Sequence, residues 1–251
     1  IQNLSASIEP VNRPELMSGR VDTKGGLIKQ KPLVIISSSD KGLCGAFNTH
    51  LIKKGKSIID SYIAEGKEPK VVTIGKKAKD ILKYTHKKYI IHSFMATSSK
   101  QVEFEEADDI GKLVVDLFES KEIDTAEVIF AKFVNPLVQE TTVRSLVPLE
   151  INEAEANDND KAGQQDTSTY DYEPDEERIL KVLIPKNISV QLYRAMLENA
   201  ASEQGARMTA MDNATNNASD MIGKLTLQYN RSRQAAITKE LIEIISGAEA
   251  V

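Results

Sequence analysis

Residues 187–251 read NISVQLYRAMLENAASEQGARMTAMDNATNNASDMIGKLTLQYNRSRQAAITKELIEIISGAEAV, and the predicted architecture follows from this stretch. It contains no proline and is rich in Ala, Leu, Met, Glu, Gln and Arg, which favour helices. Asn187 or Ser189 is suited to cap the start of a helix. Roughly 60 helical residues would span about 90 Å. Because a compact domain is much thinner than this, the sequence predicts a helix that protrudes.

Small side chains recur along this predicted helix. Alanine occupies every fourth position from residue 206 to residue 218, a stripe where a second helix could approach closely. Bulkier apolar residues lie beside it: Met208, Met211, Met221, Ile222 and Leu225. Since most helical stability comes from packing, we expect a partner helix, either in another subunit or in an N-terminal segment absent from residues 1–251. A cofactor-binding helix is the less supported alternative.

Upstream of this helix, strand-like and helix-like segments alternate. Short apolar runs with β-branched residues predict strands over residues 33–37, 70–74, 89–94, 128–134 and 138–147. Helical spacing predicts helices over residues 49–65, 76–84 and 105–120. Asn135-Pro136 joins the last two strands, which predicts an antiparallel hairpin. The alternation predicts an α/β domain, a βαβ sheet with helices on its faces.

Charge is spread unevenly over the 251 residues, whose net charge is -5. Residues 150–177 hold eleven acids and one base, so the rest of the chain carries about five positive charges. Most of this segment lacks large aliphatic side chains, so we expect a mobile loop, with an acidic docking arm as the alternative. No basic stripe with interleaved aromatics indicates nucleic-acid binding. No run is long enough to span a membrane.

A glycine-punctuated turn, DKGLCG at residues 40–45, is the one loop that could cradle a phosphate. A Walker loop requires Lys and Ser/Thr after its second glycine, whereas here Lys41 precedes Gly42 and Ala46 follows Gly45. We therefore expect the turn to pack a strand tightly against a helix.

Catalytic and metal chemistry is also poorly supported. Cys44 is the single cysteine, and we expect it to be a small buried side chain. A nucleophilic thiol would need a nearby base, for which the candidates are His50, His86 and His92. These histidines lack metal-ligand spacing. The sequence predicts no catalytic, cofactor-binding or metal-binding residue.

Two stretches resemble a known family. SSDKGLCGAFN at residues 38–48 resembles the strand-turn-helix signature of rotary (F-type) ATP synthase gamma subunits. Residues 206–250 are similar to the gamma C-terminal helix throughout, including its MTAMDNAT and YNRSRQ blocks. The resemblance implies a Rossmann-like βαβ domain plus a very long C-terminal helix. That helix would form an antiparallel coiled coil with an N-terminal helix absent from residues 1–251.

The sequence itself predicts a division of the chain, and the resemblance implies a function. Residues 1–31 would form a stub and loop, residues 32–184 the α/β domain with its acidic loop, and residues 185–251 the coiled-coil helix. The family forms the non-catalytic central stalk, which couples rotation of the membrane c-ring to ATP synthesis or hydrolysis in the alpha/beta ring. Implied partners are the alpha, beta and epsilon-type subunits and the c-ring, with no cofactor.

Partner-contact residues are implied by motif match. Arg231, Arg233 and Gln234 in YNRSRQ would contact a beta-subunit loop, since guanidinium groups form forked bonds to carboxylates. An apolar collar at the top of the ring would receive Ile237, Leu241, Ile244, Ile245 and Ala248. The alternative for each of these residues is a solvated helix face.

Two other functions and the location stay open at this stage. One alternative is a nucleotide- or small-molecule-binding α/β protein with a helical oligomerisation arm, and another is a coiled-coil scaffold that does not rotate. The family resemblance implies a peripheral position on the cytoplasmic face of a bacterial plasma membrane, or alternatively on the matrix side of the mitochondrial inner membrane.

Overall fold

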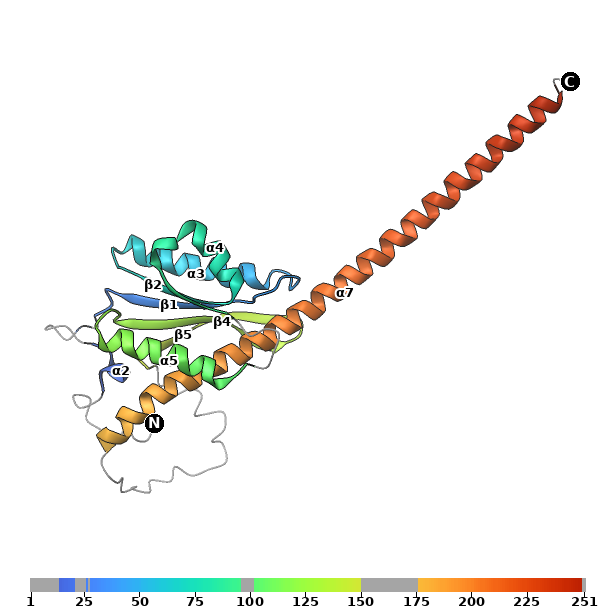
Figure 1. The fold of residues 1–251 in the computed structure, drawn as a ribbon. Helices are drawn as coiled ribbons and strands as arrows, with labels where there is room; N and C mark the ends of the chain where they lie inside the picture. Colours follow the sequence, from blue (N-terminus) through green and yellow to red (C-terminus); the bar gives the residue numbers. More distant parts are fainter. Residues whose placement is uncertain (1–13, 21–25, 27, 96–101, 150–175, 250–251) are drawn as a thin grey trace, which may run out of the picture.

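The computed structural model describes residues 14–20, 26, 28–95, 102–149 and 176–249. The predicted acidic loop, apart from its last two residues, and most of the predicted N-terminal stub lie outside these residues. An α/β domain forms one end of the molecule, and one helix runs across it and far beyond it (Figure 1). The predicted protruding helix is therefore confirmed.

The domain contains every strand and helix that the sequence predicts, with ends within three residues of the predicted ones. The strands are β1 (Pro32–Ser37), β2 (Lys70–Ile74), β3 (Ile90–Phe94), β4 (Thr125–Asn135) and β5 (Val138–Val147). The helices are α2 (Glu15–Ser18), α3 (Phe47–Ala64), α4 (Lys76–Thr85), the 3-10 helix η2 (Lys87–Tyr89), α5 (Phe104–Glu119) and α7 (Glu176–Glu249).

The five strands form one sheet in the order β3-β2-β1-β4-β5. The neighbouring pairs β3-β2, β2-β1 and β1-β4 are parallel, and β5 is antiparallel to β4. This confirms both the βαβ sheet and the hairpin predicted at Asn135-Pro136. All six residues of β1 are buried, as expected for a parallel strand covered on both faces.

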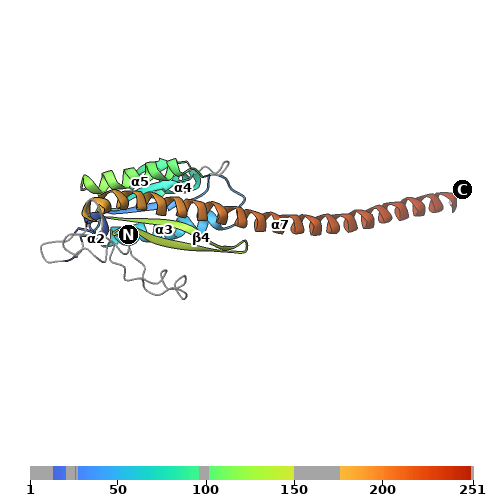
Figure 2. The ribbon, with the colours of Figure 1, turned by 90° about the horizontal axis from the view of Figure 1, so that it is seen from below.

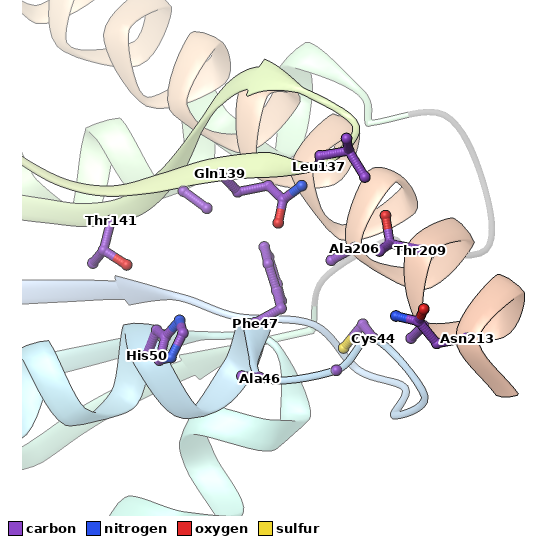
Figure 3. A pocket seen from close by; sticks show the side chains of 13 residues that line it. Cys44, Ala46, Phe47, His50, Leu137, Gln139, Thr141, Ala206, Thr209 and Asn213 are labelled. Carbon is purple, nitrogen blue, oxygen red and sulfur yellow. The ribbon is translucent and has the colours of Figure 1, made fainter. Parts of the chain in front are cut away.

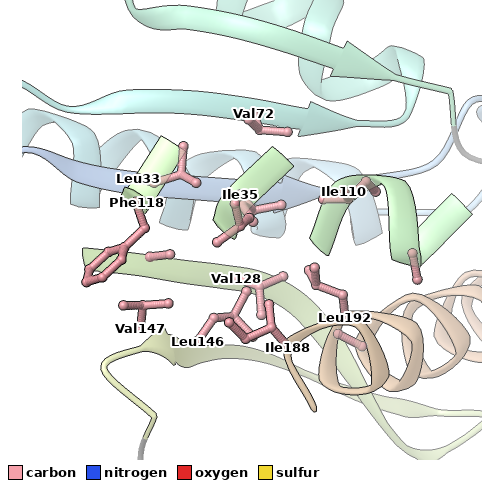
Figure 4. Close-up of a cluster of buried hydrophobic side chains, with 14 of the residues drawn as sticks. Leu33, Ile35, Val72, Ile110, Phe118, Val128, Leu146, Val147, Ile188 and Leu192 are labelled. Atoms are coloured by element: carbon pink, nitrogen blue, oxygen red, sulfur yellow. The ribbon is translucent and has the colours of Figure 1, made fainter. Parts of the chain in front are cut away.

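Alternating residues of the strands feed two apolar layers. Leu33 and Ile35 of β1 face α5 and α7, where Figure 4 shows them with Val128, Ile188 and Leu192. The intervening residues of β1 face α3 and α4 on the other side of the sheet. Because successive side chains point to opposite faces of a strand, one apolar run serves both layers.

The helix α7 begins at Glu176, so the predicted start at Asn187 or Ser189 is wrong. Pro185 lies inside the helix, where it removes a hydrogen bond at a cost of about 3 kcal/mol. Leu180 and Ile184 are fully buried against the sheet, and burial of such side chains contributes about 1.5–3 kcal/mol each. Packing therefore offsets the proline. The helix passes residue 185 without a break, and the domain division at that position remains a prediction.

Close backbone contact joins α5 to α7. A Cβ atom added to Gly111 would lie 3.2 Å from both Cα and Cβ of Ser189, and closer still to its hydroxyl. Beside this crossing, hydrogen bonds from Lys112 and then from Ser189 hold the pKa of Asp108 below its usual value. A carboxyl group whose pKa is lowered by folding stabilises the folded state at any pH above its pKa in the unfolded chain. This contribution disappears as the pH falls through the lowered pKa of the folded state.

We predict that Gly111→Ala destabilises the domain, although alanine is the better helix former. The added methyl group overlaps Ser189, and such overpacking typically costs about 1–3 kcal/mol. Urea denaturation followed by circular dichroism would measure the free energy of unfolding. Gly223→Ala is the matched control, because that helical glycine has no heavy atom within 4 Å of an added Cβ. Equal stability of Gly111→Ala and the wild type would contradict the proposed close packing.

Candidate functional site

The exposed half of α7, residues 211–247, is the candidate functional surface. Every side chain in this range is exposed except that of Asn230, which is half-buried. The helix leaves the domain and continues alone (Figure 2). Its 37 residues span about 55 Å, and an isolated helix of this composition is marginal in water. The conformation therefore requires something to pack against it.

An apolar seam runs along the nearer part of this surface. Its members are spaced alternately four and three residues apart, the spacing at which helices pair in a coiled coil. They are Met211, Thr215, Ala218, Ile222, Leu225 and Tyr229. The three largest remain well exposed, with 64% of Ile222, 57% of Leu225 and 66% of Tyr229 accessible. The seam therefore has the spacing of a coiled-coil face, and no segment among the described residues packs against it.

The alanine stripe predicted at residues 206–218 is divided between two surfaces. A four-residue step turns about 40° further around a helix than a full turn, so the stripe winds. Ala206 packs against the core layer beneath α3, and Ala210 lies 4.0 Å from the position of a Cβ on Gly45. Residues 214 and 218 are exposed. The first two alanines thus contact the domain, and only the last two are free for a partner.

The apolar residues near the end of α7 lie on a different side from the seam. The predicted collar residues Ile237, Leu241, Ile244 and Ile245 are exposed by 51–71%, and Ala248 belongs to the helix. The first seam would continue through Ser232 and Ala236. Ile237 instead follows Ala236 by one position, and the collar residues together face a direction about 100° around the helix from the seam. The two apolar surfaces therefore suit two different partners.

The three predicted polar contacts do not share one face. Arg231 and Gln234 are three residues apart and lie side by side, whereas Arg233 lies about 160° around the helix from Arg231 and about 100° from Gln234. Arg233 instead lies on the side of Ile237. Among the described residues, neither arginine is paired within the chain, so both guanidinium groups are free to bind carboxylates.

At the base of the exposed half, an open pocket of about 200 Å³ separates α7 from the glycine turn and the β4-β5 hairpin (Figure 3). It lies beyond the carboxyl end of β1, next to β4, where open α/β sheets commonly bind ligands. Small-molecule sites usually measure about 300–1,000 Å³. This pocket is smaller, and its lining is largely uncharged: Cys44, Phe47, His50, Gln139, Thr141, Thr209 and Asn213 are among its side chains.

The glycine turn makes structural contacts but, contrary to the prediction, its glycines are not tightly packed: a Cβ added to Gly42 would have no heavy atom within 4 Å, and one added to Gly45 only Ala210 at 4.0 Å. It connects β1 to α3, and the carboxylate of Asp40 accepts a hydrogen bond of 2.7 Å from the backbone N–H of Lys76 in α4. Cys44 is only 2% exposed, which confirms the prediction of a small buried side chain. Its sulfur accepts a hydrogen bond of 3.2 Å from Asn48 Nδ2.

The three histidines are dispersed. His50 lines the pocket that contains Cys44. The ring of His86 is hydrogen-bonded to Asp60 at 2.9 Å, and the ring of His92 contacts that of Phe94 at a tilt of 49°. Within the described ranges, no group of three or more His, Cys, Asp or Glu side chains could hold a metal ion. No helix in those ranges is long and apolar enough to cross a membrane.

Comparisons with known proteins agree on one family. A family model described as ATP synthase matches residues 1–251. The ATP synthase gamma chain of Pelagibacter ubique is 46% identical over 252 residues, covering 100% of this chain and 82% of that protein. The gamma chain of Parvibaculum lavamentivorans is 47% identical over 239 residues, covering 94% and 80%.

Solved structures share the fold. A chain of the Euglena gracilis mitochondrial ATP synthase (OSCP, F1 and c-ring) aligns with a TM-score of 0.64 and 19% identity, covering 88% of this chain and 73% of that one. A chain of the Tetrahymena thermophila mitochondrial ATP synthase central stalk and c-ring gives a TM-score of 0.57 and 24% identity, covering 74% and 77%.

We predict that backbone amides of residues 211–247 exchange hydrogen much faster in the isolated chain than those of residues 184–202. The first group lies on an uncovered helix, and the second is held against the sheet. Hydrogen exchange followed by mass spectrometry, before and after assembly with partner subunits, would measure both groups. Equal protection of the two groups in the isolated chain would show that the exposed half is stable without a partner.

Proposed function

This chain belongs to the family of ATP synthase gamma chains, and we propose that it is the shaft that couples rotation of the c-ring to ATP synthesis or hydrolysis in the alpha/beta ring. It is a central-stalk rotor subunit. One observation carries the proposal: α7 is continuous from Glu176 to Glu249, and its second half stands free of the chain's own domain while carrying two apolar surfaces. Surrounding subunits, together with a helix outside residues 1–251, would cover them.

The action of such a shaft is mechanical. We place the catalytic sites on beta subunits, which this chain would bias by contacting their alternative conformations differently as it turns. A contact can shift a conformational equilibrium only by its difference in free energy between the two states. The differing faces of α7 supply such differences.

The lower part of the molecule would engage the membrane side of the complex. In this proposal the α/β domain sits on the c-ring and binds an epsilon-type subunit. The seam from Met211 to Tyr229 would pack in antiparallel fashion against the N-terminal helix of the family, because its four-three spacing fits one long partner helix. The subunit would lie on the cytoplasmic face of a bacterial plasma membrane, in line with its bacterial relatives, with the mitochondrial matrix side as the alternative.

The upper part of α7 would enter the alpha/beta ring. Arg231 and Gln234, which share a face, would bind a beta-subunit loop through its carboxylates and backbone. Arg233 would instead lie at the lower edge of the apolar face that the collar surrounds. The collar contacts would come from Ile237, Leu241, Ile244, Ile245 and Ala248.

Assembled with its partners in vesicles, the chain is expected to support ATP-driven proton uptake. Lys239 is exposed on the part of α7 that is proposed to enter the alpha/beta ring, so a cysteine introduced there can be cross-linked to a cysteine placed on a beta subunit. Cross-linking should abolish ATP hydrolysis and proton uptake together, and reduction should restore both, because a fixed shaft cannot turn. Undiminished uptake with the cross-link in place would rule out the shaft.

A second prediction tests the collar face. Ile244→Asp should lower ATP-driven proton uptake about tenfold, because a buried unpaired carboxylate costs several kcal/mol. Ser246→Asp is the matched control: it adds the same charge one half-turn away, on the side of α7 opposite the collar residues. Proton uptake in vesicles, normalised to the amount of assembled complex, would measure the effect. Equal uptake for Ile244→Asp and the wild type would remove this face from the proposed contact.

A further inference from the structure

The strand β4 extends beyond the end of its neighbour β1. Pairing between these strands ends at Ile36 and Ile129, and β4 continues to Asn135. Residues two apart on a strand direct their backbone N–H and C=O groups to the same side. Ala131 therefore presents its peptide groups where β1 has already ended.

Two side chains of α7 take the place of the missing strand. The N–H of Ala131 donates a hydrogen bond of 3.2 Å to Asn199 Oδ1, and the Ser202 hydroxyl donates one of 2.9 Å to the carbonyl oxygen of Ala131. Asn199 and Ser202 are three residues apart, so both project from one face of the helix. Asn199 is 4% exposed and Ser202 fully buried, so water cannot replace either bond.

Apolar packing alone does not fix where α7 lies along the sheet. Its buried side chains Leu180, Ile184, Ile188 and Leu192 recur every four residues. A slide of four residues, about 6 Å with a turn of about 40°, would put a similar side chain into each position. Such a face could slip by one repeat and keep most of its apolar contacts, although the close crossing of Gly111 and Ser189 also opposes the slip.

The polar pair distinguishes one register from its neighbours. A slide in one direction would bring Ala195 and Glu198 to the positions of Asn199 and Ser202, and a slide in the other would bring Glu203 and Ala206. Neither pair has a hydroxyl to donate to the Ala131 carbonyl. A buried carbonyl without a donor is unfavourable, so only the observed register satisfies both backbone groups.

The hairpin tip adds a second stop just beyond this pair. Thr209 Oγ1 donates a hydrogen bond of 3.1 Å to the carbonyl oxygen of Pro136. Gly205 lets the tip approach, since an added Cβ would lie 3.2 Å from Pro136 Cα. The β4-β5 hairpin lies beside α7 where that helix leaves the domain (Figure 1).

We infer that Asn199 and Ser202 are positioning residues that lock the rotational and axial position of the shaft relative to the α/β domain. This inference rests on the proposed rotor function. Torque that enters through the α/β domain must pass to α7 across this joint. A smooth apolar face resists separation better than it resists sliding, whereas directional hydrogen bonds to a strand resist both.

Asn199→Leu and Ser202→Ala, singly and combined, test the lock in the assembled complex. Protons pumped per ATP hydrolysed should fall about twofold or more in the double variant, and the fall should grow as an opposing proton gradient raises the load. The single variant Ser202→Thr keeps the hydroxyl group, so its number of protons pumped per ATP hydrolysed should equal that of the wild type. The measurements are ATP hydrolysis and proton uptake in vesicles under graded membrane potentials.

The matched control is Ile59→Val, which loosens the opposite apolar layer, where α7 contributes Ala206 but neither of the residues that bind Ala131. It should lower the melting temperature and leave the pumping ratio independent of load. Wild-type pumping under load by the double variant would overturn the lock while leaving the rotor function intact. The same loss in Ile59→Val would also overturn it, since general stability would then explain the effect. Absence of pumping by the wild-type complex would instead reject the rotor function.

Discussion

Burial of one half of a single helix governs this molecule. Between Leu180 and Ser202, α7 forms part of the domain core and closes one face of the sheet. Beyond residue 210 the same helix has no covering in the described chain. The buried first half holds the second half in a fixed direction. Its burial also offsets the cost of Pro185 within the helix. The domain and the rod are therefore one mechanical body.

Much of the fold could be predicted because local patterns and tertiary structure agree. Most strands of the domain carry a short apolar run or β-branched residues, and each covering helix has an apolar face, so the strand and helix periods could both be recognised in the sequence. The start of α7 was not, since Pro185 is a helix breaker by every local rule. Burial of Leu180 and Ile184 outweighs that rule, and burial depends on a sheet that is distant in sequence.

The sequence predicts which apolar residues form the candidate surface, but only partly on which side of the helix each of them lies. The apolar residues near the end of the chain were recognisable, yet their side of the helix relative to Tyr229 follows only from counting turns along a helix known to be continuous. The alanines from 206 to 218 look like one stripe in sequence and divide between two surfaces in space. Asn199 and Ser202 gave no signal, because their partner is a backbone group of Ala131, about seventy residues away.

The change of apolar side between Tyr229 and Ile237 has a consequence for whatever encloses the rod. A single helix whose apolar face changes direction along its length has no rotational symmetry axis. A closed ring of repeated subunits around it cannot make equivalent contacts at every repeat. Its members must adopt unequal environments at any instant, and the angle of the helix alone determines which member has which environment.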